Sequence, residues 1–169
     1  MSSPKADTFF VDHVIPNFRE WSSLPTACSR AMNLAISLNH LADYYWREHQ
    51  TDLSRPLNAI NFGDFRRRLV ELTPEYGLVR DVADAHKHFK LDRADRNITH
   101  ATQAAIGAMG WGDASWGAGT WGGAAEVIVT FDDGSKHHFS TAVLRVMSMW
   151  RGLLGRPEGQ YLEMNSGDP

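Results

Sequence analysis

The sequence has a single cysteine, Cys28, among its 169 residues. One thiol cannot form a disulfide within the chain, and it cannot build a zinc site that needs several cysteine ligands. The sequence also lacks an apolar run long enough to span a membrane, and its first residues, MSSPKADT, do not have the basic and then apolar layout of a signal peptide. We therefore expect a cytoplasmic protein that does not enter membranes.

An excess of positive charge is missing as well, because the formal net charge is -3 and the pI is about 6.2. This balance argues against a protein that coats nucleic acid through bulk charge, although it leaves room for a local basic patch. A chain of 169 residues is long enough for one domain with a hydrophobic core and too short to favour two. What the chain has in quantity is aromatic residues, and its 6 tryptophans and 8 phenylalanines indicate a bulky aromatic core or an adhesive surface.

Apolar residues at spacings of three and four predict four helices in the first half of the chain. The first covers 8–21 and contains Pro16, so it either begins at this proline or is kinked by it. The second covers 26–50 and is apolar on nearly every side, which is typical of the central helix of a bundle. The third covers about 57–72, and the fourth begins near Thr73.

The second half of the chain predicts a small sheet and one more helix. Residues 96–103 alternate roughly as in an edge strand, and 126–139 predict a β-hairpin that turns at Asp133-Gly134. Ser140 is placed to cap a helix over 141–154. The predicted fold is therefore mainly α: a single domain with a bundle of about five helices and a small antiparallel β-hairpin or sheet near the C-terminus. Within it we expect the bundle over 8–92, a loop rich in glycine and tryptophan followed by the hairpin over 93–139, the final helix over 140–154 and a loose tail over 155–169.

The stretch 73–92, TPEYGLVRDVADAHKHFKLD, combines helix signals with ionisable groups. Thr73 suits an N-cap, and Pro74 and Glu75 suit the first turn of a helix. Helical spacing then predicts one apolar stripe and one ionisable stripe. The apolar stripe contains Val79, Val82, Ala83, His86 and Phe89, and the ionisable stripe contains Arg80, Asp84 and His88.

The segment from Arg80 to His86, RDVADAH, resembles the R-x4-6-H motif of the HEPN proteins, helical domains many of which are metal-independent ribonucleases. Those proteins often carry a polar residue after the arginine, as Asp81 is here, and the resemblance covers about residues 26–92. It implies that His86 accepts the proton of an RNA 2′-hydroxyl and that Arg80 binds the scissile phosphate. It also implies a homodimer, in which two copies of the motif meet across an interface.

These residues have a purely structural interpretation too. His86 would then be a core histidine whose ring finds a hydrogen-bond partner, and Arg80 would form an ion pair with Asp84 one turn further on. If the site is catalytic instead, Asp84 and His88 share the ionisable stripe with Arg80 and complete the candidate catalytic set.

Two other segments are candidate substrate-binding sites. Arg66 and Arg67 belong to a run of three arginines on the third predicted helix, which is either a solvated face or a phosphate contact. Trp111 and Trp116 lie in the glycine- and tryptophan-rich loop, which either packs its tryptophans onto the body of the protein or offers them for stacking on bases. The G-x-G-x-x-G pattern at 117–122 does not predict dinucleotide binding, because we expect a strand rather than a helix to follow it.

A metal site is the last candidate. His40 and Asp43 on the second helix, and Asp84 and His88 on the fourth, have the one-turn spacing that bundle cores use for metal ligands, but they do not form the Glu-x-x-His pattern of di-iron bundles. We therefore expect no metal ion and no other cofactor. Three classes of function follow: a HEPN-like protein that cleaves RNA or binds nucleotides, a non-enzymatic oligomerisation or interaction module, and a metal-dependent enzyme.

Overall fold

The computed structural model describes residues 5–51, 56–88, 96–107 and 125–156. Its elements in chain order are α1 (Ala6–Phe9), the π-helix η1 (Phe10–Val14), α2 (Ile15–Ser23), α3 (Cys28–His49), the 3₁₀-helix η2 (Pro56–Asn58), α4 (Phe62–Leu72), α5 (Glu75–Lys87), the 3₁₀-helix η3 (Ala101–Gln103), β1 (Ala104–Gly107), β2 (Glu126–Thr130), β3 (Lys136–His138) and α6 (Phe139–Leu153). Because α1, η1 and α2 follow one another without a break, they act as one helix. The predicted bundle of about five helices with a small antiparallel sheet is confirmed over these ranges.

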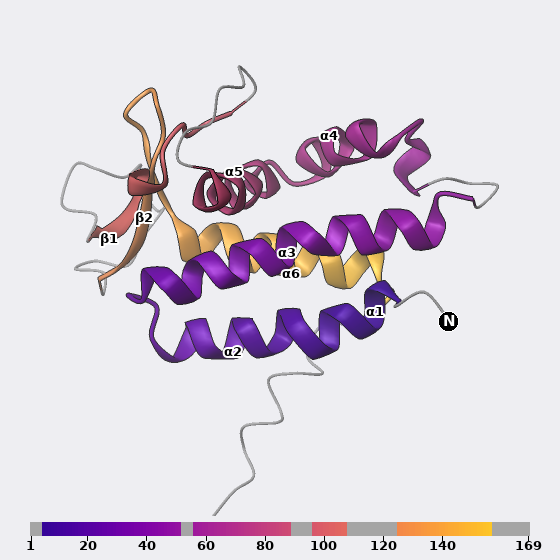
Figure 1. Cartoon of the computed structure of the whole chain (residues 1–169), viewed down its shortest axis with the longest axis horizontal. Coiled ribbons are helices and arrows are strands. Elements are labelled where there is room, and N and C mark those ends of the chain that lie inside the picture. The colour runs from indigo at the N-terminus through magenta and orange to yellow at the C-terminus, as the bar shows by residue number, and fades with distance from the viewer. Residues whose placement is uncertain (1–4, 52–55, 89–95, 108–124, 157–169) are drawn as a thin grey trace, which may run out of the picture.

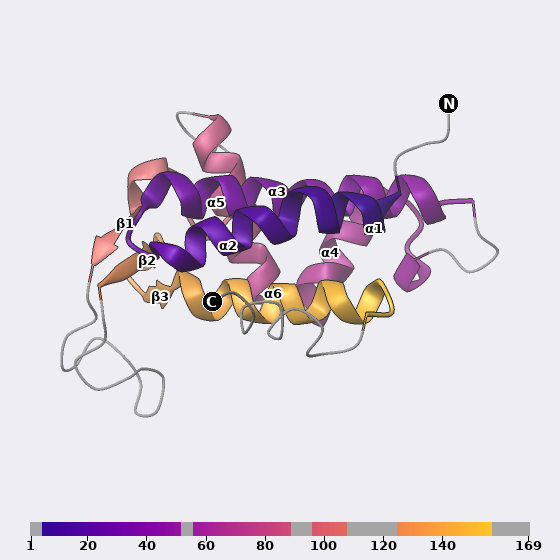
Figure 2. The same cartoon turned by 90° about the horizontal axis from the view of Figure 1, so that it is seen from below.

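The helix α3 lies at the centre of the bundle, as its apolar sequence predicts. It packs against α2, α4, α5 and α6, and α6 lies behind it in the view of Figure 1. Turned by 90°, the molecule shows α2 and α3 on one side and α6 on the other (Figure 2). The sheet lies at the end of the bundle where α6 begins (Figure 1). The core is thus shared by helices and sheet, and its largest fully buried side chains are Trp150, Tyr76, Phe10, Phe65, Phe139, Leu34, Leu38, Leu41, Leu69, Ile98, Met147 and Val14.

A π-turn in the first helix accommodates Pro16. In an α-helix the proline ring collides with the carbonyl four residues earlier, which here belongs to Asp12. The chain forms a wider turn over Phe10–Val14 at this place, and the N–H of Ile15 donates to the carbonyl of Phe10, five residues back. The helix therefore does not begin at the proline but continues through it, with the π-turn as a local distortion.

The start of the third long helix differs from the prediction. We expected it near residue 57, but Leu57 and Asn58 adopt left-handed backbone conformations with φ of 52° and 55°, and α4 begins only at Phe62. Asn61 is its N-cap, with Oδ1 accepting the N–H of Asp64 at 2.9 Å. The signal that fixes the start is therefore the Asn61 cap, which the apolar spacing does not reveal.

The edge strand also lies later than predicted. The segment 96–103 contains the η3 turn, and β1 follows it at Ala104–Gly107. The side-chain oxygen of Gln103 accepts the N–H groups of Thr99 at 2.8 Å and His100 at 2.7 Å, so these backbone donors are satisfied outside a strand ladder. The sheet has the order β1-β2-β3 and is antiparallel, with Ala104 opposite Val129.

The hairpin and the last helix confirm the prediction with one correction. The turn contains Gly134 with φ of 85°, a conformation that favours glycine, and β3 runs directly into α6. We expected Ser140 to cap α6, but His138 is the residue at the cap position, and no side chain caps it there. Instead, the carboxylate of Glu126 on β2 accepts the Ser140 N–H at 3.1 Å and also pairs with Nδ1 of His138 at 2.6 Å.

The helix α5 places its apolar stripe in the core except at its C-terminal end. Val79, Val82 and Ala83 are buried, as predicted, whereas His86 is exposed. The prediction of His86 as a core residue is therefore wrong. The cause is the position of the helix end: α5 stops at Lys87, and its last two residues are exposed to solvent, although Ala85 before them is still buried. Phe89, the next residue of that stripe, lies outside the described ranges.

None of the helices in the described ranges combines the length and the apolar character needed to cross a bilayer.

Candidate functional site

A network of polar side chains connects α3, α4, α5 and the segment that precedes η3. We call it the α3–α5 network. Several of its charged groups are buried, so they interact in a partly desolvated environment. Its members are Asn39 from α3, Arg66 from α4, Tyr76, Arg80, Asp81 and Asp84 from α5, and Arg96 and Asn97 from the following segment.

Asp81 lies at the centre of the network, with a side-chain exposure of 0%. Its Oδ1 accepts Nε of Arg80 at 2.9 Å and Nη1 of Arg96 at 2.7 Å. Its Oδ2 accepts the backbone N–H of Asn97 at 2.8 Å and the side-chain amide of the same residue at 3.1 Å. Two cations and two amide donors therefore compensate this buried carboxylate, as a charge in the interior requires.

Asp84 lies one turn further along α5 and closer to the surface. Its Oδ2 accepts Nη2 of Arg96 at 2.7 Å and lies 3.6 Å from Nη2 of Arg66. Nη2 of Arg66 also donates to Oδ1 of Asn39 at 3.0 Å, which fixes the guanidinium between α3 and α5. The side chain of Arg66 keeps an exposure of 22%, so this cation reaches solvent while Arg96, at 3%, does not.

Tyr76 forms the buried side of the network. Its hydroxyl donates to Oδ1 of Asn39 at 3.3 Å. Burial raises the pKa of Tyr76 to about 12, although the nearby guanidinium of Arg66 acts in the opposite direction. The phenol is therefore neutral at physiological pH and serves as a hydrogen-bond donor.

A histidine and a lysine meet at the surface edge of the network. Nζ of Lys87 on α5 lies 2.8 Å from Nε2 of His40 on α3. An ammonium group can only donate, so the imidazole accepts at Nε2 and carries its proton at Nδ1. Burial lowers the pKa of His40 and the charge of Lys87 lowers it further, while Asp43 and Asp84 oppose both effects. The ring is thus kept neutral beside a positive charge.

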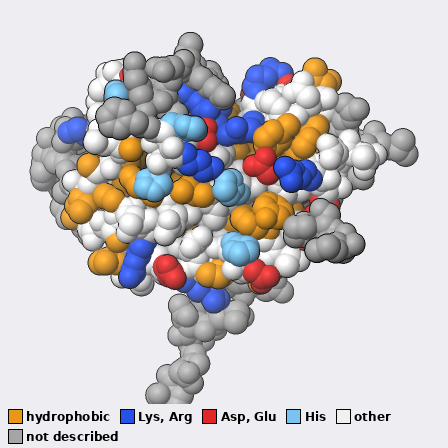
Figure 3. Space-filling model, in the orientation of Figure 1, with side chains coloured by type: hydrophobic (Ala, Val, Ile, Leu, Met, Phe, Trp, Pro, Cys, Tyr) orange, Lys and Arg blue, Asp and Glu red, His pale blue; other side chains and the backbone are white. Residues whose placement is uncertain are grey.

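This edge belongs to a face that carries many ionisable groups. Figure 3 shows lysine, arginine and histidine side chains gathered around acidic ones over the junction of α3 and α5. The cations that the contacts place there are Arg66, Arg80, Arg96 and Lys87, and the carboxylates are Asp43, Asp81 and Asp84. Arg80, Arg96 and Asp81 are buried, so the charges of this set that reach solvent are the cations Arg66 and Lys87 and the carboxylates Asp43 and Asp84.

The structure brings together some of the predicted site residues and separates others. Arg80, Asp81, Asp84 and Arg66 meet in the α3–α5 network, whereas His86 and His88 are exposed in and just after the last turn of α5. Arg67 points away from the network and pairs with Asp64 and Glu71 of its own helix. Trp111 and Trp116 lie outside the described residues.

The sequence gives little sign of the other members of the network. Arg96 reaches Asp81 across 15 positions, and Asn39 reaches Asp84 across 45. The sequence made His40 a candidate metal ligand together with Asp43, but in the structure the His40 ring contacts Lys87, 47 positions away. The packing of α3 on α5 brings His40 to Lys87 and Asn39 to Asp84, and the segment before η3 brings Arg96 to Asp81.

The arrangement offers little to a metal ion. Within the described ranges, no three or more histidine, cysteine, aspartate or glutamate side chains lie close enough together to hold one. Asp84, which belonged to one of the predicted pairs, is instead bound by arginine.

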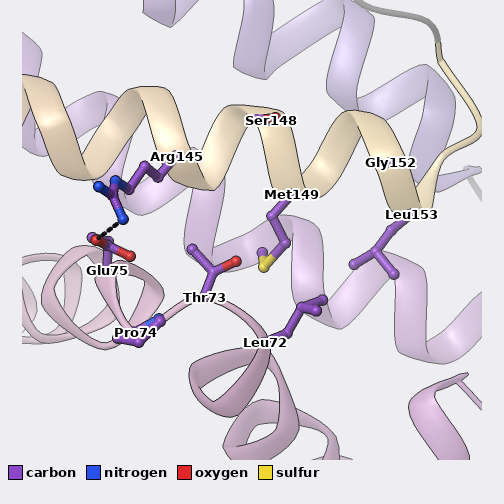
Figure 4. A pocket seen from close by; sticks show the side chains of 9 residues that line it. All are labelled: Leu72, Thr73, Pro74, Glu75, Arg145, Ser148, Met149, Gly152 and Leu153. Carbon is purple, nitrogen blue, oxygen red and sulfur yellow. Dashed lines mark ion pairs between the residues drawn. The ribbon is translucent and has the colours of Figure 1, made fainter.

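A second feature lies on the other side of α5. A groove of about 560 Å³ runs between α6 and the junction of α4 with α5 (Figure 4). Leu72, Met149 and Leu153 form much of its surface, and Glu75 and Arg145 form an ion pair of 3.0 Å at one end. Leu72 is 53% exposed and contributes apolar surface to this groove.

Comparison of the sequence and the structure with protein-family models, curated proteins and solved structures gave no match.

Proposed function

We propose that the protein binds RNA on the face where α3, α4 and α5 meet and cleaves it without a metal ion, as the resemblance to HEPN proteins suggests. The observation that carries this proposal is the set of cations at the α3–α5 network, from which Arg66 and Lys87 reach the surface. Phosphate oxygens are natural ligands for a guanidinium and an ammonium group. The neutral imidazole of His40 beside them supplies a group that can accept a proton.

In this proposal Arg80 has a positioning role. Its side chain is mostly buried and hydrogen-bonded to Asp81, so it holds the network together from within. Arg66 is the better candidate for contact with a phosphate, because Asn39 fixes its guanidinium while part of the group faces solvent. A fixed cation loses less conformational freedom on binding than a mobile one.

A comparison of two arginine variants tests the proposal. We expect the wild-type protein to cleave a mixed-sequence RNA oligonucleotide in the presence of EDTA, and Arg66→Gln to weaken RNA binding by about 10- to 100-fold, the equivalent of about 1.5–3 kcal/mol for one charged hydrogen bond. Arg30→Gln is the matched control, because Arg30 is also half-buried but donates to the Glu20 carbonyl and the Ser23 hydroxyl, on the side of α3 that faces α2. Thermal melts of both variants verify folding. Wild-type protein that melts cooperatively but leaves the RNA intact would refute the proposal.

The groove beside α6 favours a second candidate, a homodimer without enzymatic activity. We propose a second copy of the chain as its occupant, because Glu75 and Arg145 provide opposite charges that two copies related by a twofold axis can exchange. The exposed leucines of this region, Leu72 and Leu144 at 57% exposure, would be covered in such a dimer. This interface contains no residue of the Arg80–His86 motif, so it differs from the dimer that the resemblance to HEPN proteins implies, in which two copies of the motif meet.

Gly152 provides the test of the dimer. A Cβ added at this position meets no atom within 4 Å, so a larger side chain extends into the groove without disturbing the chain's own fold. We expect the wild type to sediment as a dimer, Gly152→Arg to sediment as a monomer, and the control Gly152→Ala to remain dimeric. A wild-type monomer, or a dimer that Gly152→Arg leaves intact, would exclude this interface.

A further inference from the structure

We propose that His40 is the general base of the RNA cleavage. Until a phosphate is bound, Lys87 donates a hydrogen bond to Nε2 of His40, the nitrogen that accepts the proton in the reaction. This inference rests on the function proposed above, and it assigns the base to a residue outside the Arg80–His86 motif. The geometry that supports it is the contact of 2.8 Å between Nζ of Lys87 and Nε2 of His40, made between two helices of the bundle.

The contact fixes the tautomer of His40 and occupies its acceptor nitrogen, Nε2, for as long as Lys87 stays in place. Because Lys87 donates to Nε2, the lone pair of this nitrogen faces the surface edge of the network rather than the core. His40 is half-buried and Lys87 is exposed, so the lysine can move while the ring stays in place. The charged groups that act on the ring are Lys87 and Asp84 from α5 and Asp43 from α3 itself.

When a phosphate binds, Lys87 would leave His40 and pair with a phosphate oxygen instead. The ammonium group is attracted to a phosphate oxygen more strongly than to a neutral imidazole, and its departure frees Nε2 of His40. Nε2 then accepts the proton of the RNA 2′-hydroxyl, the bond between O2′ and phosphorus forms, and the bond between phosphorus and O5′ breaks. The leaving O5′ takes a proton from water, and the protonated His40 returns its proton to solvent. The products are a 2′,3′-cyclic phosphate and a 5′-hydroxyl, with no change in oxidation state.

His40 is better placed for this step than the other histidines near the network. His86 and His88 are exposed at the end of α5, whereas His40 is held by Lys87 and follows Asn39, which binds Arg66. The base and the proposed phosphate contact share Asp84 as a neighbour, because the Asp84 carboxylate acts on the His40 ring and its Oδ2 lies 3.6 Å from Nη2 of Arg66. Proximity of base and phosphate-binding group is what the reaction requires.

The experiment compares three histidine variants on a labelled mixed-sequence RNA oligonucleotide with EDTA present. We expect His40→Asn to lower cleavage by at least about 100-fold, the usual contribution of a general base, and to melt like the wild type. His49→Asn is the matched control on the same helix, where the ring packs on Tyr45 far from the network, and it should cleave normally. The same oligonucleotide with 2′-O-methyl groups should resist the wild type. Loss of cleavage in His86→Asn with normal cleavage in His40→Asn would overturn the assignment and leave the proposed function standing.

A titration tests the His40–Lys87 contact without any reaction. We expect the NMR titration of the His40 imidazole to show a pKa below the ordinary value of 6.5, and Lys87→Met to raise it, because the variant removes a neighbouring positive charge. The acid limb of the pH–rate profile should shift in the same direction. A His40 pKa that does not respond to Lys87→Met would overturn the inference whatever the activity, and wild-type protein that leaves RNA intact would remove the proposed function together with this assignment.

Discussion

Asp81 shows how strongly a single residue can depend on its neighbours in this fold. Its carboxylate is fully buried, and it is stable there only because Arg80, Arg96 and Asn97 all donate to it. Desolvation of a carboxylate costs several kcal/mol, which the surrounding donors offset. If the charge of Asp81 were removed, the buried guanidinium groups of Arg80 and Arg96 would lose their counter-ion. Asp81 therefore stabilises the fold by pairing with these donors.

We therefore expect Asp81→Asn to destabilise the protein by about 3–5 kcal/mol, the cost of leaving buried charges without their partner. Chemical denaturation followed by circular dichroism measures the change. Asp12→Asn serves as the control, because Asp12 is exposed on η1 and its substitution should stay within about 0.5 kcal/mol. A loss below about 1 kcal/mol for Asp81→Asn would mean that the network does not stabilise the protein.

Tyr76 makes the stability sensitive to alkaline pH. Its pKa is about 12 in the folded protein because the residue is buried, against an ordinary value of 10.0. A pKa raised by folding favours the protonated form, so this contribution is complete below pH 10 and is lost as the pH rises from about 10 to 12. The shift corresponds to about 3 kcal/mol. We expect the stability advantage of the wild type over Tyr76→Phe to fall between pH 9 and pH 12 in denaturation experiments. A difference that stays constant over this range would show that Tyr76 is not protected from ionisation.

At the scale of the elements, the N-terminus of α4 carries an acid-sensitive contact. The backbone N–H of Ile60, followed by the side chain of Arg67, holds the pKa of Asp64 at about 2, below the ordinary 3.8. A pKa lowered by folding favours the charged form, so the contact stabilises the protein fully above pH 4 and is lost as the pH falls toward 2.

Asp64→Asn should remove this part of the acid response. We expect the wild type to lose stability more steeply than the variant between pH 4 and pH 2, as measured by urea midpoints at several pH values. Asp133→Asn is a useful comparison, because the Ser135 hydroxyl and N–H also lower the pKa of Asp133, but in the hairpin turn rather than at a helix start. Parallel acid profiles for wild type and Asp64→Asn would contradict a stabilising role for the contact between this carboxylate and the Ile60 N–H.

The sequence predicted elements well where their signals are local. The apolar character of α3 and the Asp133-Gly134 turn both depend on neighbours in the chain, and both predictions are confirmed. One error falls where a contact from elsewhere decides the outcome, because Glu126 on β2 satisfies the start of α6 in place of Ser140. The others depend on local side-chain contacts that the apolar pattern does not contain: the Asn61 cap of α4, and the bonds of Gln103 to the N–H groups of Thr99 and His100.

The candidate site was predictable only along one helix. Arg80, Asp81 and Asp84 share α5, so helical spacing could group them in advance. The contacts of Arg96 with Asp81 and of Lys87 with His40 join segments whose distance in space depends on the whole packing. The exposure of His86 depends on where α5 ends, and helix ends are the least predictable part of a periodic pattern.

At the scale of the whole molecule, polar contacts join the hairpin and the first helix to the other helices of the bundle. Asn97 accepts the N–H of Asp132 on the hairpin at 2.8 Å while it donates to Asp81 on α5. At the other end, Arg156 after α6 forms a two-pronged ion pair with Asp7 on α1, with Nη2 and Oδ2 at 2.6 Å, and Ala6 donates to Glu48 on α3 at 2.8 Å. The sheet and the first helix are therefore fastened to α3, α5 and α6.

This fastening predicts that the helices and the sheet unfold together. The core is continuous, since Ile98, Val127 and Val129 pack in the same cluster as the helix residues, and neither part buries its apolar surface alone. We follow two signals as the temperature rises: far-ultraviolet circular dichroism, which reports mainly the helices, and the protection of the β2 amides from hydrogen exchange. We expect both signals to be lost in the same transition. Asp81→Asn should lower both transitions equally, because Asp81 holds Asn97 and through it the hairpin. A β2 strand that exchanges well before the helices melt would show that the sheet is a separate cooperative unit.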